Sequence, residues 1–289
     1  DPDRETLSYI KTKSGATYFE DSEGEPWRCY NFIADSVCYQ LVEDPEQFYQ
    51  SGSSFGHFLK QLINYPASSL KETIPDFHNT VKRFDAFQVA LERDLKNRAV
   101  TCRPEIDFVL ARRDDCAVLV KQQEDGTLPL RVTHNDTKLN NILFDGETGK
   151  GLCIIDLDTI MPGLAANDFG DSIRFGAATA EEDERDLDKM HFDIGLYELY
   201  VKGYLESAGE VLTEAEIESL PWGARLMTLE CGIRFLTDYL QGDTYFKTDY
   251  PEHNLIRTRT QFRLVDEMEQ QFERMQEIVR EYANRTMCR

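Results

Sequence analysis

The chain has 289 residues, of which 41% are hydrophobic and 29% are charged, and this composition is typical of a soluble globular protein with one or two domains. Its 53 acidic and 32 basic residues give a net charge of −21, and such a field repels nucleic acids and anionic membranes. The sequence therefore predicts no nucleic-acid partner and no membrane partner, whereas neutral and cationic small molecules are compatible with it.

The seven cysteines are scattered along the chain without a Cys-x-x-Cys pair. This pattern favours reduced thiols in a cytoplasmic protein over a zinc site or a disulfide framework. No apolar run is long enough to cross a bilayer. The chain opens at Asp1-Pro2-Asp3-Arg4 without an initiator Met, which favours a processed or partial chain. Both a monomer and a homodimer are compatible with the sequence.

The first part of the chain predicts a hairpin followed by helices. Residues 16–19 and 27–33 are expected to be strands on either side of a turn at 21–24. Apolar residues then recur at helical spacing. They predict two helices and a third, weaker one over residues 48–63, 81–95 and 106–121.

After residue 130 the periodicity changes to that of short strands. Residues 130–133 are expected to be extended, and 142–144 and 152–155 are expected to pair as antiparallel strands across a turn-rich link. Beyond Pro162 the chain is predicted to be mostly helical. Helices are expected near residues 187–207, 213–219, 221–240 and 255–284. The predicted class is α+β, with a fragment of sheet before a helical body that carries one small hairpin.

Two carboxylates flank this predicted hairpin. Asp136 lies in the loop that leads into it, and Asp156 lies just past its exit. Because an antiparallel hairpin returns the chain close to where it left, the two residues are expected to be neighbours in space. A carboxylate pair of this kind is compatible with phosphoryl transfer, which needs a base for the attacking hydroxyl, oxygen ligands for Mg²⁺ and a cation near the phosphates.

Each of these parts has a candidate in the sequence. Asp136 is the predicted base, and Lys138 is placed to meet the γ-phosphate of ATP. Asn141 and Asp156 offer the oxygen ligands that Mg²⁺ prefers. Asp158 is expected either to assist the metal or to hydrogen-bond to nearby backbone.

The segment around the predicted base matches a known pattern. His134-x-Asp136, with Asn141 five residues later, follows the catalytic loop His-Arg-Asp-x-x-x-x-Asn of protein kinases. His134 is interpreted as a buried hydrogen-bonding brace for this loop and not as a proton carrier. A loop rich in Asn, Asp and Thr can also simply form a turn, but the combination with Asp156 favours chemistry.

A second motif is misleading. Asp168-Phe169-Gly170 spells the metal-binding tripeptide of protein kinases, but it lies thirty-two residues after Asp136, beyond the hairpin. Asp156 occupies the expected position instead. Asp168 and Asp171 are therefore predicted to hydrogen-bond beneath the catalytic loop. Arg174 is expected either to face the substrate or to pair with one of these aspartates.

Longer strings carry a family resemblance. Segments 130–141, 156–163 and 168–176 resemble the aminoglycoside phosphotransferase and choline kinase superfamily, which has a protein-kinase-like fold. The similarity is greatest to the branch of the bacterial N-acetylhexosamine 1-kinases, and segments 75–80 and 238–246 share it. The resemblance spans essentially the whole chain.

The resemblance implies phosphorylation of the anomeric hydroxyl of N-acetylglucosamine or N-acetylgalactosamine, with ATP and Mg²⁺. It assigns the base role to Asp136 and the metal role to Asn141 and Asp156, and it implies sugar contacts from Arg234 and Tyr245. From the residues alone, Arg234 lies in an apolar helical stretch where an unpaired charge is costly, so an internal ion pair is favoured for it.

The start of the chain departs from the family pattern, because the strand with the ATP-binding Lys and the helix with its Glu partner are not found. The resemblance then implies mostly a helical C-terminal lobe, residues 35–289, with residues 1–34 as the remnant of a truncated N-terminal β lobe and hinge. Asn31, Phe32 and Ile33 are predicted to lie near the adenine. Two alternatives stay open: a kinase of another alcohol, such as an aminoglycoside, choline or homoserine, and a non-catalytic kinase-like binding domain.

Overall fold

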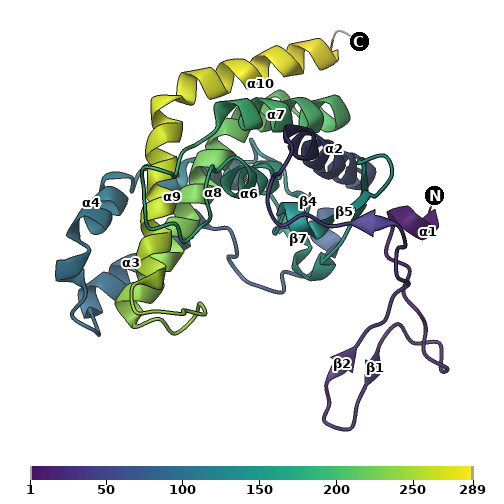
Figure 1. Cartoon of the computed structure of the whole chain (residues 1–289), viewed down its shortest axis with the longest axis horizontal. Helices are drawn as coiled ribbons and strands as arrows, with labels where there is room; N and C mark the ends of the chain where they lie inside the picture. Colours follow the sequence, from purple (N-terminus) through teal and green to yellow (C-terminus); the bar gives the residue numbers. More distant parts are fainter. Residues whose placement is uncertain (1, 288–289) are drawn as a thin grey trace.

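A computed structural model describes residues 2–287 as a helical body with small β-sheets at one side (Figure 1). The helices are α1 (Pro2–Glu5), α2 (Pro45–Leu62), α3 (Thr80–Arg93), α4 (Arg103–Ala111), α5 (Val118–Glu124), α6 (Ala165–Gly176), α7 (Ile194–Ala208), α8 (Glu214–Gln241), α9 (His253–Gln270) and α10 (Phe272–Met287). The strands are β1 (Phe19–Glu20), β2 (Pro26–Trp27), β3 (Ser36–Val37), β4 (Arg131–Thr133), β5 (Ile142–Asp145), β6 (Gly151–Ile154) and β7 (Met161–Gly163). Within the described range, no helix combines the length and the apolar character needed to cross a bilayer.

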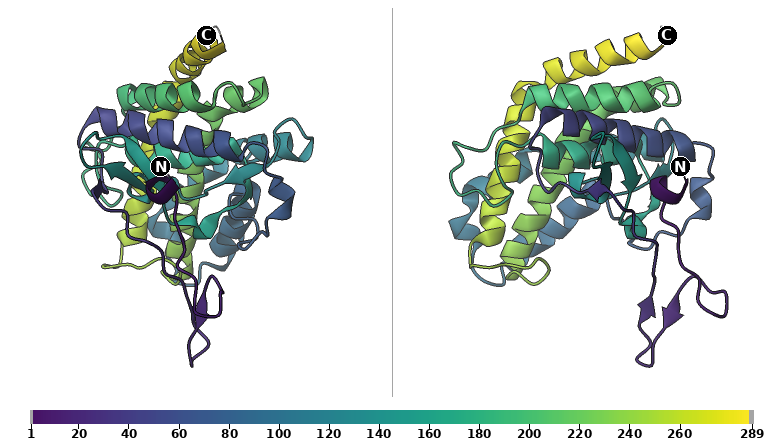
Figure 2. Two further views of the ribbon diagram at one scale, coloured as in Figure 1. Left: turned by 90° about the vertical axis from the view of Figure 1, so that its right-hand side faces the viewer. Right: turned by 45° about the vertical axis from the view of Figure 1, so that its right-hand side comes forward.

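The N-terminal segment projects from this body as a narrow hairpin (Figures 1 and 2). Strands β1 and β2 pair antiparallel, so the predicted hairpin is confirmed, although its strands have only two residues each. Its base is attached to the body, because Arg4 forms a 3.0 Å ion pair with Asp145 on β5. The carboxylate of Asp145 thereby links β5 to the start of the chain.

Two small sheets determine where the chemically interesting loops lie. Strands β3, β5 and β6 form one antiparallel sheet, which contains the predicted pair β5–β6. Strand β4 pairs with β7, opposing Thr133 to Met161, and this second sheet was not predicted. The segments 134–141 and 155–160 therefore both run from one sheet to the other. They are held side by side at their two ends.

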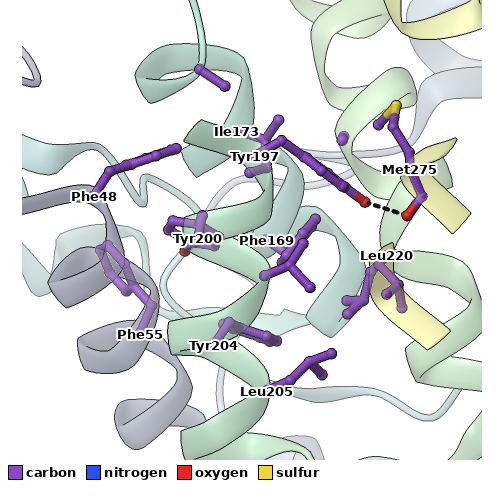
Figure 3. Packing of buried hydrophobic residues seen from close by; sticks show 14 of the residues in the cluster. Phe48, Phe55, Phe169, Ile173, Tyr197, Tyr200, Tyr204, Leu205, Leu220 and Met275 are labelled. Atoms are coloured by element: carbon purple, nitrogen blue, oxygen red, sulfur yellow. Dashed lines mark hydrogen bonds between the residues drawn. The ribbon is translucent and has the colours of Figure 1, made fainter. Parts of the chain in front are cut away.

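The largest core cluster lies between α2, α6, α7 and α10. Tyr197, Tyr200 and Tyr204 of α7 surround the buried Phe169 of α6, with ring centroids 5.4–6.0 Å apart (Figure 3). Burial of such aromatic side chains is a large source of stabilisation, commonly about 1.5–3 kcal/mol for each fully buried apolar side chain. This packing fixes α6 against the body, and α6 in turn supports the loop at residues 134–141.

Helix α8 packs against this cluster and also contributes to a second buried hydrophobic cluster. It approaches α6 closely. A Cβ atom on Gly223 would lie 2.0 Å from the backbone oxygen of Ala166, so only glycine permits this approach. The sequence predicts a break at Pro221, and this is wrong, because one helix runs from Glu214 to Gln241 with Pro221 inside it. Proline removes a single N–H donor there, and the burial of the surrounding α8 residues compensates for it.

Three further helix predictions differ from the structure. The segment 106–121 is broken after α4, where Arg112 donates to the carbonyl of Phe108 and to Glu269. The helix predicted from residue 187 begins at Ile194, after an irregular stretch. The long last helix is split at Gln271 into α9 and α10, which run in different directions (Figure 1).

Candidate active site

The loop at residues 134–141 is held from below by two carboxylates of α6. Asp168 accepts hydrogen bonds of 2.7 Å from the backbone N–H groups of both His134 and Asn135. Asp171 accepts a 3.0 Å hydrogen bond from the backbone N–H of Thr137. Both carboxylates are buried. The prediction that Asp168 and Asp171 hydrogen-bond beneath the catalytic loop is confirmed.

The two carboxylates differ in their proton affinity. Burial raises the pKa of Asp168, and the hydrogen bonds from the backbone N–H groups of His134 and Asn135 do not fully offset it. Burial also disfavours the charge of Asp171, but the Arg174 guanidinium outweighs it and holds the pKa of Asp171 below its usual value. Arg174 reaches Asp171 at 3.0 Å and Glu182 at 2.9 Å. Arg174 therefore has the predicted aspartate partner, and it also lines the cavity described below.

His134 is a buried brace, as predicted. Its Nε2 lies 2.9 Å from the carbonyl oxygen of Ile155, and its Nδ1 lies 3.3 Å from the backbone nitrogen of Asp136. Because a carbonyl only accepts and a backbone N–H only donates, these partners require a neutral ring with its proton on Nε2. The ring is fully buried, with Phe55 and Phe58 in edge contact. It joins the loop of Asp136 to the segment of Asp156.

The carboxylate of Asp136 has two partners and stays accessible. Lys138 forms a 2.8 Å ion pair with its Oδ1, and Asn141 donates to its Oδ2 at 3.1 Å. The side chain is 27% exposed and lines the cavity. Burial disfavours the charge of Lys138, but the hydrogen bond and charge of Asp136 outweigh it, so the pKa of Lys138 is raised. A half-buried carboxylate held on both sides fits the requirements of a general base.

The predicted metal ligands lie beside this loop. The amide nitrogen of Asn141 donates to the carbonyl oxygen and to the carboxylate of Asp136, so its amide oxygen takes no part in these two hydrogen bonds. Asp156 is exposed in a left-handed conformation with φ 58°, and its carboxylate makes no recorded ion pair or hydrogen bond within residues 2–287. The backbone N–H of Ile155 donates to the carbonyl of Asn141 at 2.9 Å, which holds the segment of Asp156 beside the loop of Asp136. An amide oxygen, a carboxylate and nucleotide phosphates form a donor set that suits Mg²⁺.

Asp158 has a partner that the sequence did not indicate. It forms an ion pair with Arg28 of the N-terminal segment. Within residues 2–287 the predicted alternative, a hydrogen bond between this carboxylate and nearby backbone, is not found, and a metal role for Asp158 stays a prediction. In the described part of the chain, no three His, Cys, Asp or Glu side chains cluster in a metal-binding arrangement.

A cavity of about 700 Å³ opens above the catalytic loop. Asp136 and Lys138 line it, together with residues of α6 and α8. Its lining also includes five aromatic side chains, namely Phe77, Phe175, Phe235, Tyr245 and Phe246. The cavity size and its mixture of rings and polar groups are typical of a small-molecule site.

Charge pairing in this cavity is uneven. Glu230 is bound by His78 at 3.1 Å, and Glu182 is bound by Arg174. Arg234, in contrast, has no carboxylate partner among residues 2–287, so the internal ion pair expected from the sequence is not found. Its guanidinium lies 6.0 Å from the ring centroid of Tyr245 and also contacts the rings of Phe77 and Phe246. Arg234 and Tyr245, both predicted to contact substrate, face the cavity that contains Asp136.

The three residues predicted near the adenine lie in the N-terminal segment. Phe32 is 89% exposed, whereas Ile33 is 5% exposed. Asn31 is exposed and donates its backbone N–H to the carbonyl of Ser8. None of these three residues lines the cavity that contains Asp136. Their contact with adenine stays a prediction.

Two groups at the site were missed by sequence reasoning. His78 and Glu230 form a buried pair that lines the cavity. Asp238, near the end of α8, accepts from the backbone N–H groups of residues 244, 245 and 246 and so shapes the loop that carries Tyr245. A charged residue in an otherwise apolar helical stretch is the one sequence signal that could have identified Glu230 and Asp238.

A family model and several solved structures match this chain. The model of the phosphotransferase enzyme family, APH, matches residues 13–204. An aminoglycoside phosphotransferase from Alicyclobacillus acidocaldarius is 13% identical, with a TM-score of 0.57 over 99% of this chain and 79% of that chain. The choline kinase of Cryptosporidium parvum is 12% identical, with a TM-score of 0.55 over 96% of this chain and 77% of that chain. A microcompartment-associated aminopropanol kinase is 14% identical, with a TM-score of 0.52 over 94% of this chain and 77% of that chain.

Proposed function

The chain belongs to the phosphotransferase enzyme family and has its α+β, protein-kinase-like fold, and on this premise we propose that it phosphorylates the anomeric hydroxyl of an N-acetylhexosamine with ATP and Mg²⁺. The observation that carries the choice of acceptor is Arg234, a cation without a carboxylate partner in the described chain, placed among aromatic rings in the cavity of Asp136. Fold alone does not determine an acceptor, so the choice of acceptor depends on the residues of this site.

Asp136 is the proposed base. Its carboxylate faces the cavity, where it can accept the proton of the acceptor hydroxyl as that oxygen attacks the γ-phosphorus of ATP and the bond to ADP breaks. Lys138, at 2.8 Å from the base, is placed to offset charge on the transferred group. Asn141 and Asp156 would hold Mg²⁺, which neutralises negative charge on the phosphates when it is bound. Asn31, Phe32 and Ile33 are proposed to contact the adenine.

The charges of the cavity support a neutral acceptor. A cationic acceptor such as choline requires a carboxylate or an aromatic cage free of competing cations. Here Asp171, Glu182 and Glu230 all have basic partners. Lys247 adds a further cavity cation without a carboxylate partner in the described chain. Neutral hydroxyl and acetamide groups can accept hydrogen bonds from a guanidinium, and the rings can pack against a sugar face.

A substrate panel tests this proposal. N-acetylglucosamine and N-acetylgalactosamine are compared with choline, ethanolamine, homoserine and kanamycin, with ATP and Mg²⁺, and ADP formation is measured. We expect turnover of the N-acetylhexosamines alone, and its loss in Asp136→Asn. Turnover of a cationic acceptor without turnover of either sugar would refute the choice of acceptor. No turnover together with no ATP–Mg²⁺ binding would favour a non-catalytic binding domain.

A further inference from the structure

We propose that His78 is a positioning residue, an imidazolium that ties the acceptor cavity to the peptide bond preceding Asp136. The kinetic part of this inference rests on the proposed phosphotransfer, whereas the hydrogen-bonding part does not. No part of the mechanism described above uses His78. It lies two residues before α3, contacts Glu230 of α8 and the carbonyl of Asn135, and lines the cavity.

Both ring nitrogens of His78 face groups that accept hydrogen bonds. Nδ1 lies 3.1 Å from Oε1 of Glu230, and Nε2 lies 3.3 Å from the carbonyl oxygen of Asn135. A neutral ring has one N–H and could satisfy only one of them. The His78 and Glu230 side chains are only 8% and 1% exposed, so water does not readily replace a lost partner. The ring is therefore expected to carry both protons.

The state of Glu230 is consistent with this assignment. Arg83 lies 4.0 Å from its Oε1, and the hydroxyl of Thr80 donates to its Oε2 at 3.4 Å. These donors and the His78 ring favour an ionised carboxylate, because a buried charge is stable only when it is paired and hydrogen-bonded. An ionised Glu230 in turn favours the imidazolium.

The peptide unit between Asn135 and Asp136 is held from both sides by histidines. Its carbonyl lies against Nε2 of His78, and its N–H lies against Nδ1 of His134. Asn135 has a left-handed backbone with φ 64°, which costs free energy for a residue other than glycine. A clamp with one protonated and one neutral histidine therefore fixes the backbone from which the Asp136 carboxylate extends.

The surroundings of His78 favour its charged form. Glu230 faces it from α8, Asp168 and Asp171 act on it from α6, and Arg83 and Arg234 are the nearby cations from α3 and α8. Asp136 and Lys138 lie on the same cavity. Burial lowers the pKa of His78, but Glu230, Asp171 and the Asn135 carbonyl outweigh it, so the pKa is raised. The clamp is thus complete below this raised pKa and is lost as the pH rises through it.

Two substitutions separate the two hydrogen bonds. In His78→Gln the amide nitrogen occupies roughly the place of Nε2 and can still donate to Asn135. In His78→Asn it occupies roughly the place of Nδ1 and can reach only Glu230. We expect kcat of His78→Asn to be about tenfold below that of His78→Gln, the equivalent of one hydrogen bond, with a smaller change in the acceptor KM. His57→Gln, at an exposed histidine of α2, is the matched control.

The pH dependence gives a second measurement. The wild-type protein is expected to lose kcat as the pH rises through the raised pKa of His78, and His78→Gln is expected to lack this limb because its amide does not titrate. Equal kcat values for the two variants, or an unchanged limb in His78→Gln, would overturn the positioning role.

An NMR titration of the protein without substrate distinguishes failure of this inference from failure of the proposed function. The His78 ring should titrate above the ordinary histidine value, and the backbone amide signal of Asp136 should follow it in the wild type and the His57→Gln control but not in His78→Gln. A ring that is neutral at pH 6.5, or an Asp136 amide that does not follow it, refutes the clamp whatever the acceptor.

Discussion

Replacement of Asp168 by Asn tests how the catalytic loop is supported. The carboxylate accepts two 2.7 Å hydrogen bonds from the backbone N–H groups of His134 and Asn135, one on each oxygen. An asparagine can accept only one of them, and its NH₂ group would face the other N–H. A buried donor without an acceptor costs about 1–3 kcal/mol.

The charge of Asp168 reduces this loss. Because burial raises the pKa of Asp168, the ionised carboxylate is itself unfavourable, and a neutral amide removes that cost. We therefore expect the free energy of unfolding at pH 7 to fall by about 1–3 kcal/mol and not more. The wild type should also gain stability relative to Asp168→Asn as the pH falls toward the raised pKa, since the folded state then binds the proton more tightly than the unfolded chain.

Urea unfolding and steady-state kinetics measure these effects together. A shift of the loop backbone displaces Asp136, so kcat should fall by about ten- to a hundredfold, which corresponds to the same range of free energy. The Mg²⁺ concentration for half-maximal rate should not change, because Asp168 points into the protein and not toward the metal site. Asp188→Asn, at an exposed position, is the control. A variant with wild-type stability but a raised Mg²⁺ requirement would show that Asp168 is a metal ligand, as in the protein-kinase tripeptide.

Three further substitutions have distinct expected outcomes. Asp136→Asn should lower kcat by about two to four orders of magnitude while nucleotide affinity stays nearly unchanged, and survival of activity within severalfold would exclude Asp136 as the base. Asp156→Ala should weaken Mg²⁺-dependent nucleotide binding, measured by calorimetry with and without EDTA, and unchanged binding would exclude it as a ligand. Asp238→Asn should raise the acceptor KM by about tenfold with little change in kcat, because it disturbs the loop of Tyr245; a fall in kcat alone would contradict this.

The local parts of the site could be predicted from the sequence. Asp136 and Asn141 are only five residues apart on one loop, so their proximity could be predicted from the spacing. The pairing of 142–144 with 152–155 follows from a short hairpin. The spacing of Asp156 and Asp168 from Asp136 also predicted a structural position for Asp168. This is confirmed, since Asp168 hydrogen-bonds beneath the loop. Each of these inferences depends on few residues and short separations.

The long-range parts could not be predicted in the same way. The pairing of β4 with β7 joins residues about thirty apart through only three residues on each strand, and no periodicity marks such short strands. The contact of His78 with Glu230 joins residues 152 apart in sequence. Helix α8 passes through Pro221 because its tertiary packing compensates for a lost hydrogen bond, and that packing is invisible in a local window.

The charge of the cavity illustrates the same limit. A net charge of −21 suggests attraction of cationic acceptors, yet a charge acts on a bound ligand mainly through near neighbours. At contact distance an ion pair such as Asp171–Arg174 cancels most of its own field, whereas charges on the exposed surface are screened beyond about 8–10 Å in salt solution. Among the residues that the structure describes, Arg234 and Lys247 are the cavity cations without a carboxylate partner, and their charges are the ones that a ligand in the cavity meets. The acidic composition therefore does not argue for a cationic acceptor, and the local pairing argues against one.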